Sequence, residues 1–258
     1  MKKIKFLKDY ELEKFSRQII LQKIGEKGQL EIMNCPILVI GCGGLGTTAA
    51  TYLSMSGVLN IGIVDHDKVS LSNLNRQLLF AERDVGKKKV CMLKEKLVSI
   101  NPNVNLNLYD KKIDLKNGFK IIKNYKIVLD CTDNFKSRYI INHLCFKEKK
   151  ILVSAALYNF EIQLLAFRPW LNVGYPCYNC IFPEQKRDVS FKNCNDQGIV
   201  SSVAGIGGLF QANMTLNILI DNDQKKFKEL ILFDCKNNNL KKIKTKKDLN
   251  CNVCKKQN

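Results

Sequence analysis

Histidine and long apolar runs are scarce in this chain. It has only His66 and His143, so an enzyme that relied on histidine for general acid–base catalysis would be poorly equipped. No stretch approaches the ~20 consecutive apolar residues that a membrane-spanning helix needs, and no apolar run of signal-peptide length follows the first residues. We therefore expect a cytoplasmic protein with no membrane partner.

Internal repeats and Pro- or Ser-rich linkers are also missing, which predicts one continuous domain over residues 1–258. With 45% hydrophobic residues, a chain of this length can bury a substantial α/β core without help from disulfides.

Acidic residues are few compared with basic ones: 24 Asp and Glu against 42 Lys and Arg give a formal net charge of +18. Such an excess can indicate nucleic-acid binding. Here lysine rather than arginine carries most of the positive excess, and Asn and Ile are abundant too. We therefore favour a bias in codon composition as the cause of the charge, and we expect no nucleic-acid partner. The lysine runs are interpreted as solvated surface. Steering of an acidic protein partner is the weaker alternative.

Short apolar runs alternate with helical patterns along the first part of the chain. The run 36–40 is too brief for a helix, is bounded by Pro and Gly, and predicts a buried strand that leads into a glycine-rich turn. A helix over 47–56 and a strand over 61–65 complete a β-α-β unit. The alternation continues with a helix over 85–100, strands over 104–108 and 127–130, a helix over 134–148 and a strand over 151–155.

The pattern changes beyond residue 156. An apolar helix is predicted over about 203–220, and antiparallel strands are predicted over 163–167, 230–233 and 240–244. At the other end, apolar residues at helical spacing predict a helical arm over 9–33. The predicted fold class is α/β: a Rossmann-like, mostly parallel sheet that continues into antiparallel strands, with a helical N-terminal arm.

The turn after the first strand has the spacing G-x-G-x-x-G at Gly41, Gly43 and Gly46, with another glycine at Gly44. Glycines let the backbone approach phosphates without a Cβ in the way, and the following helix offers free N–H groups and a positive dipole end. Asp65, 19 residues beyond Gly46, can accept hydrogen bonds from ribose hydroxyls. Alone, this motif fits NAD, FAD or ATP, and a tight turn without a ligand is the structural alternative.

Residues further along separate these options. A reaction at the α-phosphate of ATP brings an anionic carboxylate against a polyanion, so it needs cations on the phosphates and a carboxylate to hold Mg²⁺. Arg76 and Lys89 can supply the cations, and Asp133, just past a buried strand, can supply the carboxylate. A dehydrogenase needs none of them. Taken singly, Arg76 and Lys89 could be surface charges and Asp133 a helix N-cap.

Cysteine is plentiful, with 11 residues, and four of them form two C-x-x-C pairs, Cys177/Cys180 and Cys251/Cys254. Two such pairs can close a tetrahedral four-thiolate site, for which Zn²⁺ is the natural occupant. Such a site would be structural and would attach the C-terminal tail to the loop around 176–183. A redox motif is the alternative, but neither pair is predicted to open a helix after a strand.

Cys194 lies in the polar segment 192–198, where an inert core cysteine would be out of place. It is a candidate nucleophile, and a loop thiol with no required role is the alternative. The remaining cysteines fall on predicted elements or their junctions and are interpreted as small apolar fillers.

Together these motifs resemble the ubiquitin-activating-enzyme-like superfamily, which includes ThiF, MoeB and HesA. The resemblance runs nearly end to end and covers, in one order, residues 16–19, the glycine loop, 72–77, 85–89, 130–134 and both C-x-x-C pairs. Members adenylate the C-terminal glycine of a small ubiquitin-like protein and are typically dimers. A C-terminal carboxylate is already ionised at pH 7, so the implied chemistry needs no histidine and would rest on positioning and charge neutralisation.

The resemblance also implies roles for single residues. Asp133 would be the essential magnesium-associated acid, and Arg17 would reach into the site of a partner subunit. Cys194 would form a covalent link with the activated carrier, as a thioester or an acyl disulfide. Asp65 and Asp67 would serve the sugar and metal region, and Arg76, Gln77 and Lys89 the phosphates. The full nucleotide-binding set that we expect is Gly41, Gly43, Gly44, Gly46, Asp65, Asp67, Asn73, Arg76, Gln77, Lys89, Asp133 and Asn134.

Within the family, the segments at 168–170 and 181–183 and Cys194 look most like the ThiF type. That type activates a ThiS-like sulfur carrier ending in Gly-Gly for thiamine thiazole synthesis. The alternatives are the MoeB type, which acts on the carrier of molybdopterin synthesis, an NAD-dependent oxidoreductase, and a catalytically idle adaptor.

The expected domain then divides into the arm, a nucleotide-binding half over 36–156, and a carrier-binding half over 157–258 that holds the zinc site. The implied cofactors are ATP, Mg²⁺ and Zn²⁺. The implied partners are the carrier, a sulfur donor protein and a second copy of the chain.

Overall fold

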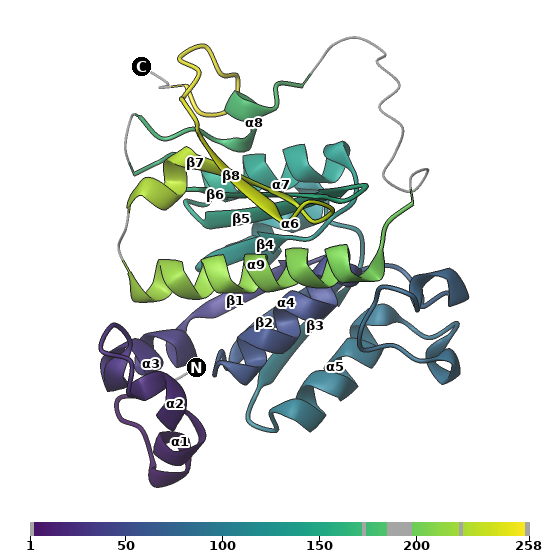
Figure 1. Cartoon of the computed structure of the whole chain (residues 1–258), viewed down its shortest axis with the longest axis vertical. Helices are drawn as coiled ribbons and strands as arrows, with labels where there is room; N and C mark the ends of the chain where they lie inside the picture. Colours follow the sequence, from purple (N-terminus) through teal and green to yellow (C-terminus); the bar gives the residue numbers. More distant parts are fainter. Residues whose placement is uncertain (1–2, 172–173, 185–197, 222–223, 256–258) are drawn as a thin grey trace.

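A computed structural model of the chain describes residues 3–171, 174–184, 198–221 and 224–255 (Figure 1). Within these residues, eight strands form one sheet in the order β3-β2-β1-β4-β5-β6-β7-β8. The pairs from β3 to β5 are parallel, and those from β5 to β8 are antiparallel. The predicted fold class is confirmed. The strands span Pro36–Ile40 (β1), Asn60–Asp65 (β2), Asn105–Asp110 (β3), Ile127–Asp130 (β4), Ile151–Tyr158 (β5), Glu161–Phe167 (β6), Glu229–Asp234 (β7) and Asn239–Lys244 (β8).

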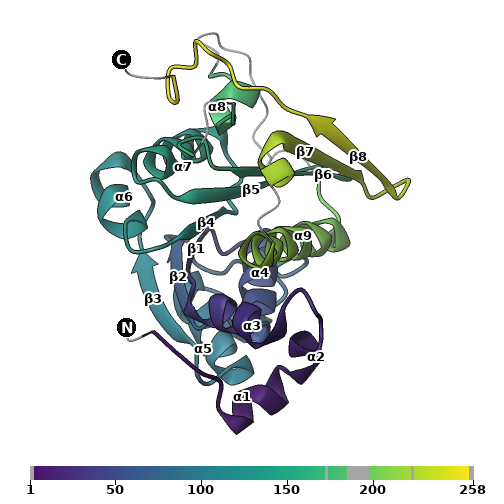
Figure 2. The same ribbon diagram turned by 90° about the vertical axis from the view of Figure 1, so that its left-hand side faces the viewer.

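Helices cover both faces of the parallel part, which explains why its central strands read as unbroken apolar runs. Alternate residues of β1 enter two different cores: Ile37 and Val39 pack with α4, α5 and α9, whereas Leu38 and Ile40 pack with α6 and α7. Figure 2 shows these two helix layers on opposite sides of the sheet. The helices are Asp9–Lys14 (α1), Ser16–Ile19 (α2), Gly25–Asn34 (α3), Gly44–Met55 (α4), Lys89–Ile100 (α5), Leu115–Ile122 (α6), Phe135–Lys147 (α7), Tyr178–Ile181 (α8) and Ser201–Ile220 (α9).

Helix α6 was absent from the sequence-based prediction. Because β3 and β4 lie in the same parallel sheet, the chain must cross over between them, and a helix usually makes that crossover. Asp114 marks its start: the carboxylate accepts hydrogen bonds from the backbone N–H groups of Lys116 and Asn117, both at 2.8 Å. This N-cap was the missed signal.

The helical N-terminal arm predicted over 9–33 is confirmed, and the structure shows that it consists of three short helices, α1, α2 and α3. Gly25 has φ +55, a left-handed conformation that suits glycine and redirects the chain before α3. Gln18 and Gln29 hold the arm on the body: the amide groups of both donate to the carbonyl of Ser56 at 3.1 and 3.0 Å.

Helix α9 corrects the expectation that no segment resembles a membrane span. By length and composition it is apolar enough to cross a membrane, yet half of its apolar window is buried inside the fold. It packs against α4 and against β5 and β6. Those contacts account for its apolar sequence as that of a core helix.

Candidate active site

A cavity of about 840 Å³ opens at the carboxyl ends of β1, β2 and β4. The strand order reverses between β1 and β4, and open α/β sheets bind ligands at such a switch point. Basic side chains on its wall outnumber acidic ones two to one, which favours an anionic ligand. Most of the predicted nucleotide residues line it, namely Gly41, Gly43, Gly44, Asp65, Asp67, Asn73, Arg76, Gln77, Lys89, Asp133 and Asn134.

The glycines of the loop are needed for two different reasons: some allow close packing, and one leaves open space in the cavity. A Cβ on Gly46 would collide with the backbone carbonyl oxygen of Gly41, and one on Gly44 would lie 2.8 Å from the carbonyl oxygen of Arg76. These two allow close packing. Gly43 lines the cavity as Gly44 does, but no described atom lies within 4 Å of the place its Cβ would take. Gly43 therefore leaves open space beside the start of α4, where a phosphate can approach the helix N-terminus.

Asp65 joins the end of β2 to the glycine loop. One of its carboxylate oxygens accepts from the backbone N–H of Cys42 at 2.6 Å and the other from that of Asp67 at 2.8 Å. These bonds fix the carboxylate at the cavity wall. Each oxygen keeps a lone pair for a ribose hydroxyl.

Lys89 is the first residue of α5, and its side chain is only 7% exposed. Its ammonium lies 3.0 Å from the carboxylate of Asp67, which is 51% exposed. A buried ammonium needs such a partner. The pairing uses one of three N–H donors and leaves the others for a phosphate at the same wall.

Arg76 and Gln77 follow the short 3₁₀ turn Leu71–Asn73. Arg76 donates to the carbonyl of Ser72 at 2.9 Å and to the amide oxygen of Asn75 at 3.1 Å, so local contacts hold its guanidinium at the cavity. Gln77 is 3% exposed, and its amide oxygen has no hydrogen-bond partner among the described residues. A phosphate cannot donate to that oxygen at neutral pH, so the phosphate role implied for Gln77 would fall to its NH₂ group.

By residue type, Asp133 and Asn134 are both candidates for the N-cap of the helix that follows them. Asn134 is the N-cap of α7, and its side-chain oxygen accepts from the N–H of Ser137 at 2.9 Å. Asp133 is therefore not the cap. Its exposed carboxylate lines the cavity and accepts from the side-chain amide of Asn134 at 3.2 Å. An exposed carboxylate oxygen beside a phosphate site suits Mg²⁺.

Sequence reasoning missed a buried layer beneath Asp133. Asp130 is fully buried, and its carboxylate accepts from the hydroxyls of Thr132 at 2.7 Å and Ser154 at 3.1 Å. Burial raises the pKa of Asp130, and the positive charge of Arg138 opposes that shift. The guanidinium of Arg138 also donates to the carbonyl of Thr132 at 2.9 Å. These contacts hold the Asp133 loop, residues 131–134, on the end of β4.

Gln211 of α9 supports the same loop from the other side of the sheet. Its amide donates to the carbonyls of Asp130 and Val153, both at 2.9 Å, and its oxygen accepts from the thiol of Cys131 at 3.2 Å. No short-range pattern predicts contacts across some 80 residues of sequence. The signal was a single Gln in a mostly apolar helix.

The cavity tests neither the role predicted for Arg17 nor the one predicted for Cys194. Arg17 is exposed on α2, outside this cavity. Cys194 lies outside the described residues. The roles predicted for both stay predictions, as does the carrier-binding role of 157–258. His66 lines the cavity, whereas His143 lies on α7 against the ring of Phe119.

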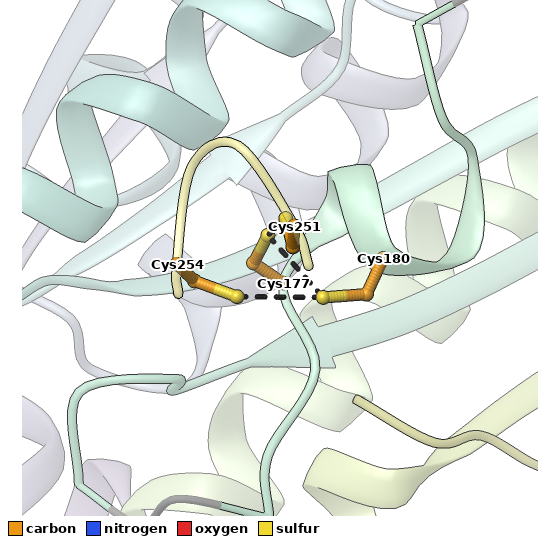
Figure 3. A group of neighbouring side chains, drawn as sticks. All are labelled: Cys177, Cys180, Cys251 and Cys254. Carbon is orange, nitrogen blue, oxygen red and sulfur yellow. Dashed lines mark hydrogen bonds between the residues drawn. The ribbon is translucent and has the colours of Figure 1, made fainter. Parts of the chain in front are cut away.

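The four cysteines of the two C-x-x-C pairs come together (Figure 3). Their sulfurs lie within 4.8 Å of one another, with separations of 3.8 Å for Cys177–Cys180, 3.6 Å for Cys177–Cys251 and 3.4 Å for Cys180–Cys254. Four thiolates at about 2.3 Å from a zinc ion stand about 3.8 Å apart, so the cluster fits tetrahedral Zn²⁺. Hydrogen bonds from the thiols of Cys177 and Cys254 lower the pKa of Cys180, whereas the neighbouring thiols and burial raise the pKa of Cys177. The four thiols therefore favour one thiolate without a metal, and a bound cation would stabilise the others.

Metal analysis tests the cluster directly. Protein purified without chelators should contain about one zinc per chain, and Cys251→Ser should lose it and unfold at a lower temperature. Cys235→Ser is the matched control, because Cys235 lies outside the cluster, and it should keep the metal. Wild-type protein with far less than one zinc per chain would contradict the assignment.

Comparison with known proteins places the chain in a family. The ThiF family model matches residues 15–253. The chain is 36% identical over 249 residues to "Adenylyltransferase and sulfurtransferase MOCS3" of Culex quinquefasciatus, covering 96% of this chain and 56% of that protein. It is 37% identical over 247 residues to "Probable molybdopterin-synthase adenylyltransferase" of Gracilaria tenuistipitata var. liui, covering 96% and 68%.

Solved structures agree on the fold. E. coli MccB with ATP superposes with a TM-score of 0.80 at 21% identity, covering 96% of this chain and 76% of that one. MccB with MccA-N7isoASN superposes with a TM-score of 0.81 at 19% identity, covering 95% and 75%. The chain spans about half the length of the MOCS3 relatives that it matches. From its motifs, its fold and its match over residues 15–253, this chain belongs to the ThiF family.

Proposed function

We propose that this chain uses ATP to adenylate the C-terminal carboxylate of a ubiquitin-like sulfur-carrier protein, releasing pyrophosphate. The observation that carries the proposal is the cavity, which gathers the glycine loop, Asp65, Arg76, Lys89 and Asp133 at the switch point of the sheet. The names of the relatives, which include adenylyltransferases, support the same activity.

The reaction needs no general base. An oxygen of the carrier's carboxylate attacks the α-phosphorus of ATP, a new P–O bond forms, and the bond to the bridging oxygen of the β-phosphate breaks. Pyrophosphate leaves with that electron pair, and no proton moves because the carboxylate is already ionised. The protein supplies position and charge. Arg76 and Lys89 would neutralise phosphate oxygens beside the start of α4, and Asp133 would hold Mg²⁺, which would supply further positive charge.

The names of the relatives favour a different carrier from the one that we expected from the sequence. The expected ThiS-like, thiamine-specific carrier is not confirmed, and the name of the molybdopterin-synthase relative favours the MoeB-type alternative. We therefore propose a carrier of the molybdopterin-synthase type. Its C-terminal Gly-Gly would reach the cavity in extended form, because glycine adds no side chain where the backbone must pass close to the phosphates.

A second copy of the chain completes this proposal. Arg17 is exposed on α2 and lies away from the cavity of its own chain. In a homodimer, it would supply a cation to the partner's site. A sulfur donor protein would act after adenylation and supply the sulfur for the carrier.

Exchange between ATP and labelled pyrophosphate tests the activity. It should depend on a carrier ending in Gly-Gly and vanish when the carrier's C-terminus is amidated, because an amide cannot attack phosphorus as a carboxylate does. Molybdopterin-type and ThiS-like carriers are compared side by side. Equal or better exchange with the ThiS-like carrier would overturn the MoeB-type assignment, and absence of exchange with both would overturn the adenylation proposal.

Cys194 is assigned a step after adenylation, in which its thiol would attack the acyl carbon of the adenylated carrier, form a thioester and release AMP. Cys194→Ser should therefore keep carrier-dependent exchange within about twofold of wild type and stop sulfur delivery to the carrier. Thiocarboxylate on the carrier, measured by mass spectrometry with the sulfur donor present, is the second measurement. Wild-type amounts of thiocarboxylate in the variant would refute the covalent role.

A further inference from the structure

One face of α7 runs from the cavity to the four-cysteine cluster. Asn134, Arg138 and Asn142 stand at intervals of four residues, which places their side chains along the same side of a helix. Asn134 and Arg138 line the cavity. Asn142, one turn further along, reaches the cluster instead.

At the cluster end, Asn142 is 2% exposed and forms hydrogen bonds with the segment that carries the first two cysteines. Its amide lies 3.7 Å from the sulfur of Cys177 and donates to the side-chain oxygen of Asn179 at 2.8 Å. Its own oxygen accepts from the backbone N–H of Tyr178 at 3.0 Å. These bonds couple the orientation of α7 to the position of the metal-binding thiols.

Tyr178 links the cysteine cluster to Arg138 at the cavity. It directly follows Cys177 and is 3% exposed. Burial raises the pKa of Tyr178 to about 12, and the guanidinium of Arg138, which lies near the Tyr178 hydroxyl, opposes that rise. Edge contacts with the rings of Phe167 and Tyr139, at centroid distances of 6.0 and 5.7 Å, hold the Tyr178 ring in place. Arg138 in turn donates to the carbonyl of Thr132, inside the Asp133 loop.

We propose that the four-cysteine cluster positions the Asp133 loop through Tyr178 and Arg138, so that metal binding and adenylation are coupled. Tyr178 is the positioning residue, because it lies outside the cavity wall and acts through Arg138. A bound metal fixes Cys177, and with it the backbone that orients the Tyr178 hydroxyl. Loss of the metal frees that backbone and weakens the hold of Arg138 on the loop.

Hydrogen exchange of the full chain, loaded with zinc or stripped by a chelator, tests the coupling without any catalysis. Stripping should raise deuterium uptake at least about threefold in peptides covering 130–138, besides the expected rise around the cysteines. Peptides from β1 are the internal reference for global unfolding, because this strand lies at the centre of the sheet. Unchanged uptake over 130–138 after complete stripping would overturn the proposal.

Tyr178→Phe separates the coupling from the stability of the cluster, because it removes one hydroxyl and keeps the ring. Without the hydroxyl, Arg138 loses a polar neighbour, so we expect roughly a tenfold lower kcat of exchange with unchanged KM for ATP and unchanged zinc content. Tyr139→Phe is the matched control, since that hydroxyl contacts the carbonyl of Pro183 at 3.4 Å. It should behave as wild type.

The two effects should not add: stripping zinc from Tyr178→Phe should change uptake over 130–138 far less than stripping wild type. Wild-type kcat and uptake in Tyr178→Phe, or equal losses in Tyr139→Phe, would contradict the coupling. The kinetic part rests on the proposed adenylation, whereas hydrogen exchange does not. If wild type shows no carrier-dependent turnover, the proposed function fails, and the uptake comparison still decides the coupling.

Discussion

Asp133→Ala should lower carrier-dependent ATP–pyrophosphate exchange by a factor of about 10² to 10³, the usual effect of removing one preorganised group that stabilises transition-state charge. The carboxylate is exposed at the cavity wall, and Asn134 rather than Asp133 caps α7. The free energy of unfolding should therefore stay within about 0.5 kcal/mol of wild type. Asp133→Asn should lose nearly as much activity, because the proposed binding of Mg²⁺ depends on the charge of this side chain and not on its shape.

Asn134→Ala is the neighbouring comparison, and this variant, unlike Asp133→Ala, should lose stability. It removes the acceptor for the N–H of Ser137 and should destabilise the protein by about 1 kcal/mol. Thermal or denaturant unfolding of the two variants measures the difference. Exchange by Asp133→Ala near the wild-type rate would contradict the role of this carboxylate, and a large loss of stability in that variant would mean that its lost activity carries no information.

Gly43→Ala and Gly46→Ala should fail for different reasons. Alanine at 43 has room in the fold but occupies the open space beside the start of α4, so ATP should bind about 10 to 100 times more weakly, because the phosphates lose their close approach. Alanine at 46 meets the backbone carbonyl of Gly41 and should cost about 3 kcal/mol or more in stability, as overpacking against backbone does.

Calorimetric titration with a non-hydrolysable ATP analogue and thermal unfolding separate these two effects. Gly43→Ala should unfold near the wild-type temperature and bind weakly, whereas Gly46→Ala should be poorly folded before binding is measured. Wild-type affinity in Gly43→Ala would show that the phosphates do not pass this position. Wild-type stability in Gly46→Ala would contradict the packing of the loop on α4.

The sequence was sufficient wherever a local pattern corresponds to a local structure. Three local features predicted the β-α-β unit: the apolar run of β1, the glycine loop that follows it and the acid at the end of β2. They also predicted that the cavity lies at the carboxyl ends of these strands. The two C-x-x-C pairs predicted a four-thiol cluster, because metal-ligand spacing is itself a local signal. The structure brings the four sulfurs together as expected.

Features that depend on distant residues could not be predicted in this way. Asp133 and Asn134 are both good N-cap residues by type, and only the backbone conformation shows that Asn134 is the cap. The buried contacts of Asp130 with Ser154 and Gln211 join β4 to β5 and α9, whose pairing depends on the whole sheet. The helical arm was predicted, but its division into α1, α2 and α3 was not, because apolar spacing alone does not show the break before Gly25.

The most direct test of the central claim is the intact mass of the carrier after incubation with this chain, ATP and Mg²⁺, with pyrophosphatase added to remove pyrophosphate. The account predicts that the carrier gains the mass of one AMP residue at its C-terminal glycine, that Asp133→Ala gives no such product, and that an amidated carrier stays unmodified. An unmodified carrier under these conditions, with ATP bound and the protein folded, would contradict the claim that this cavity activates a protein C-terminus.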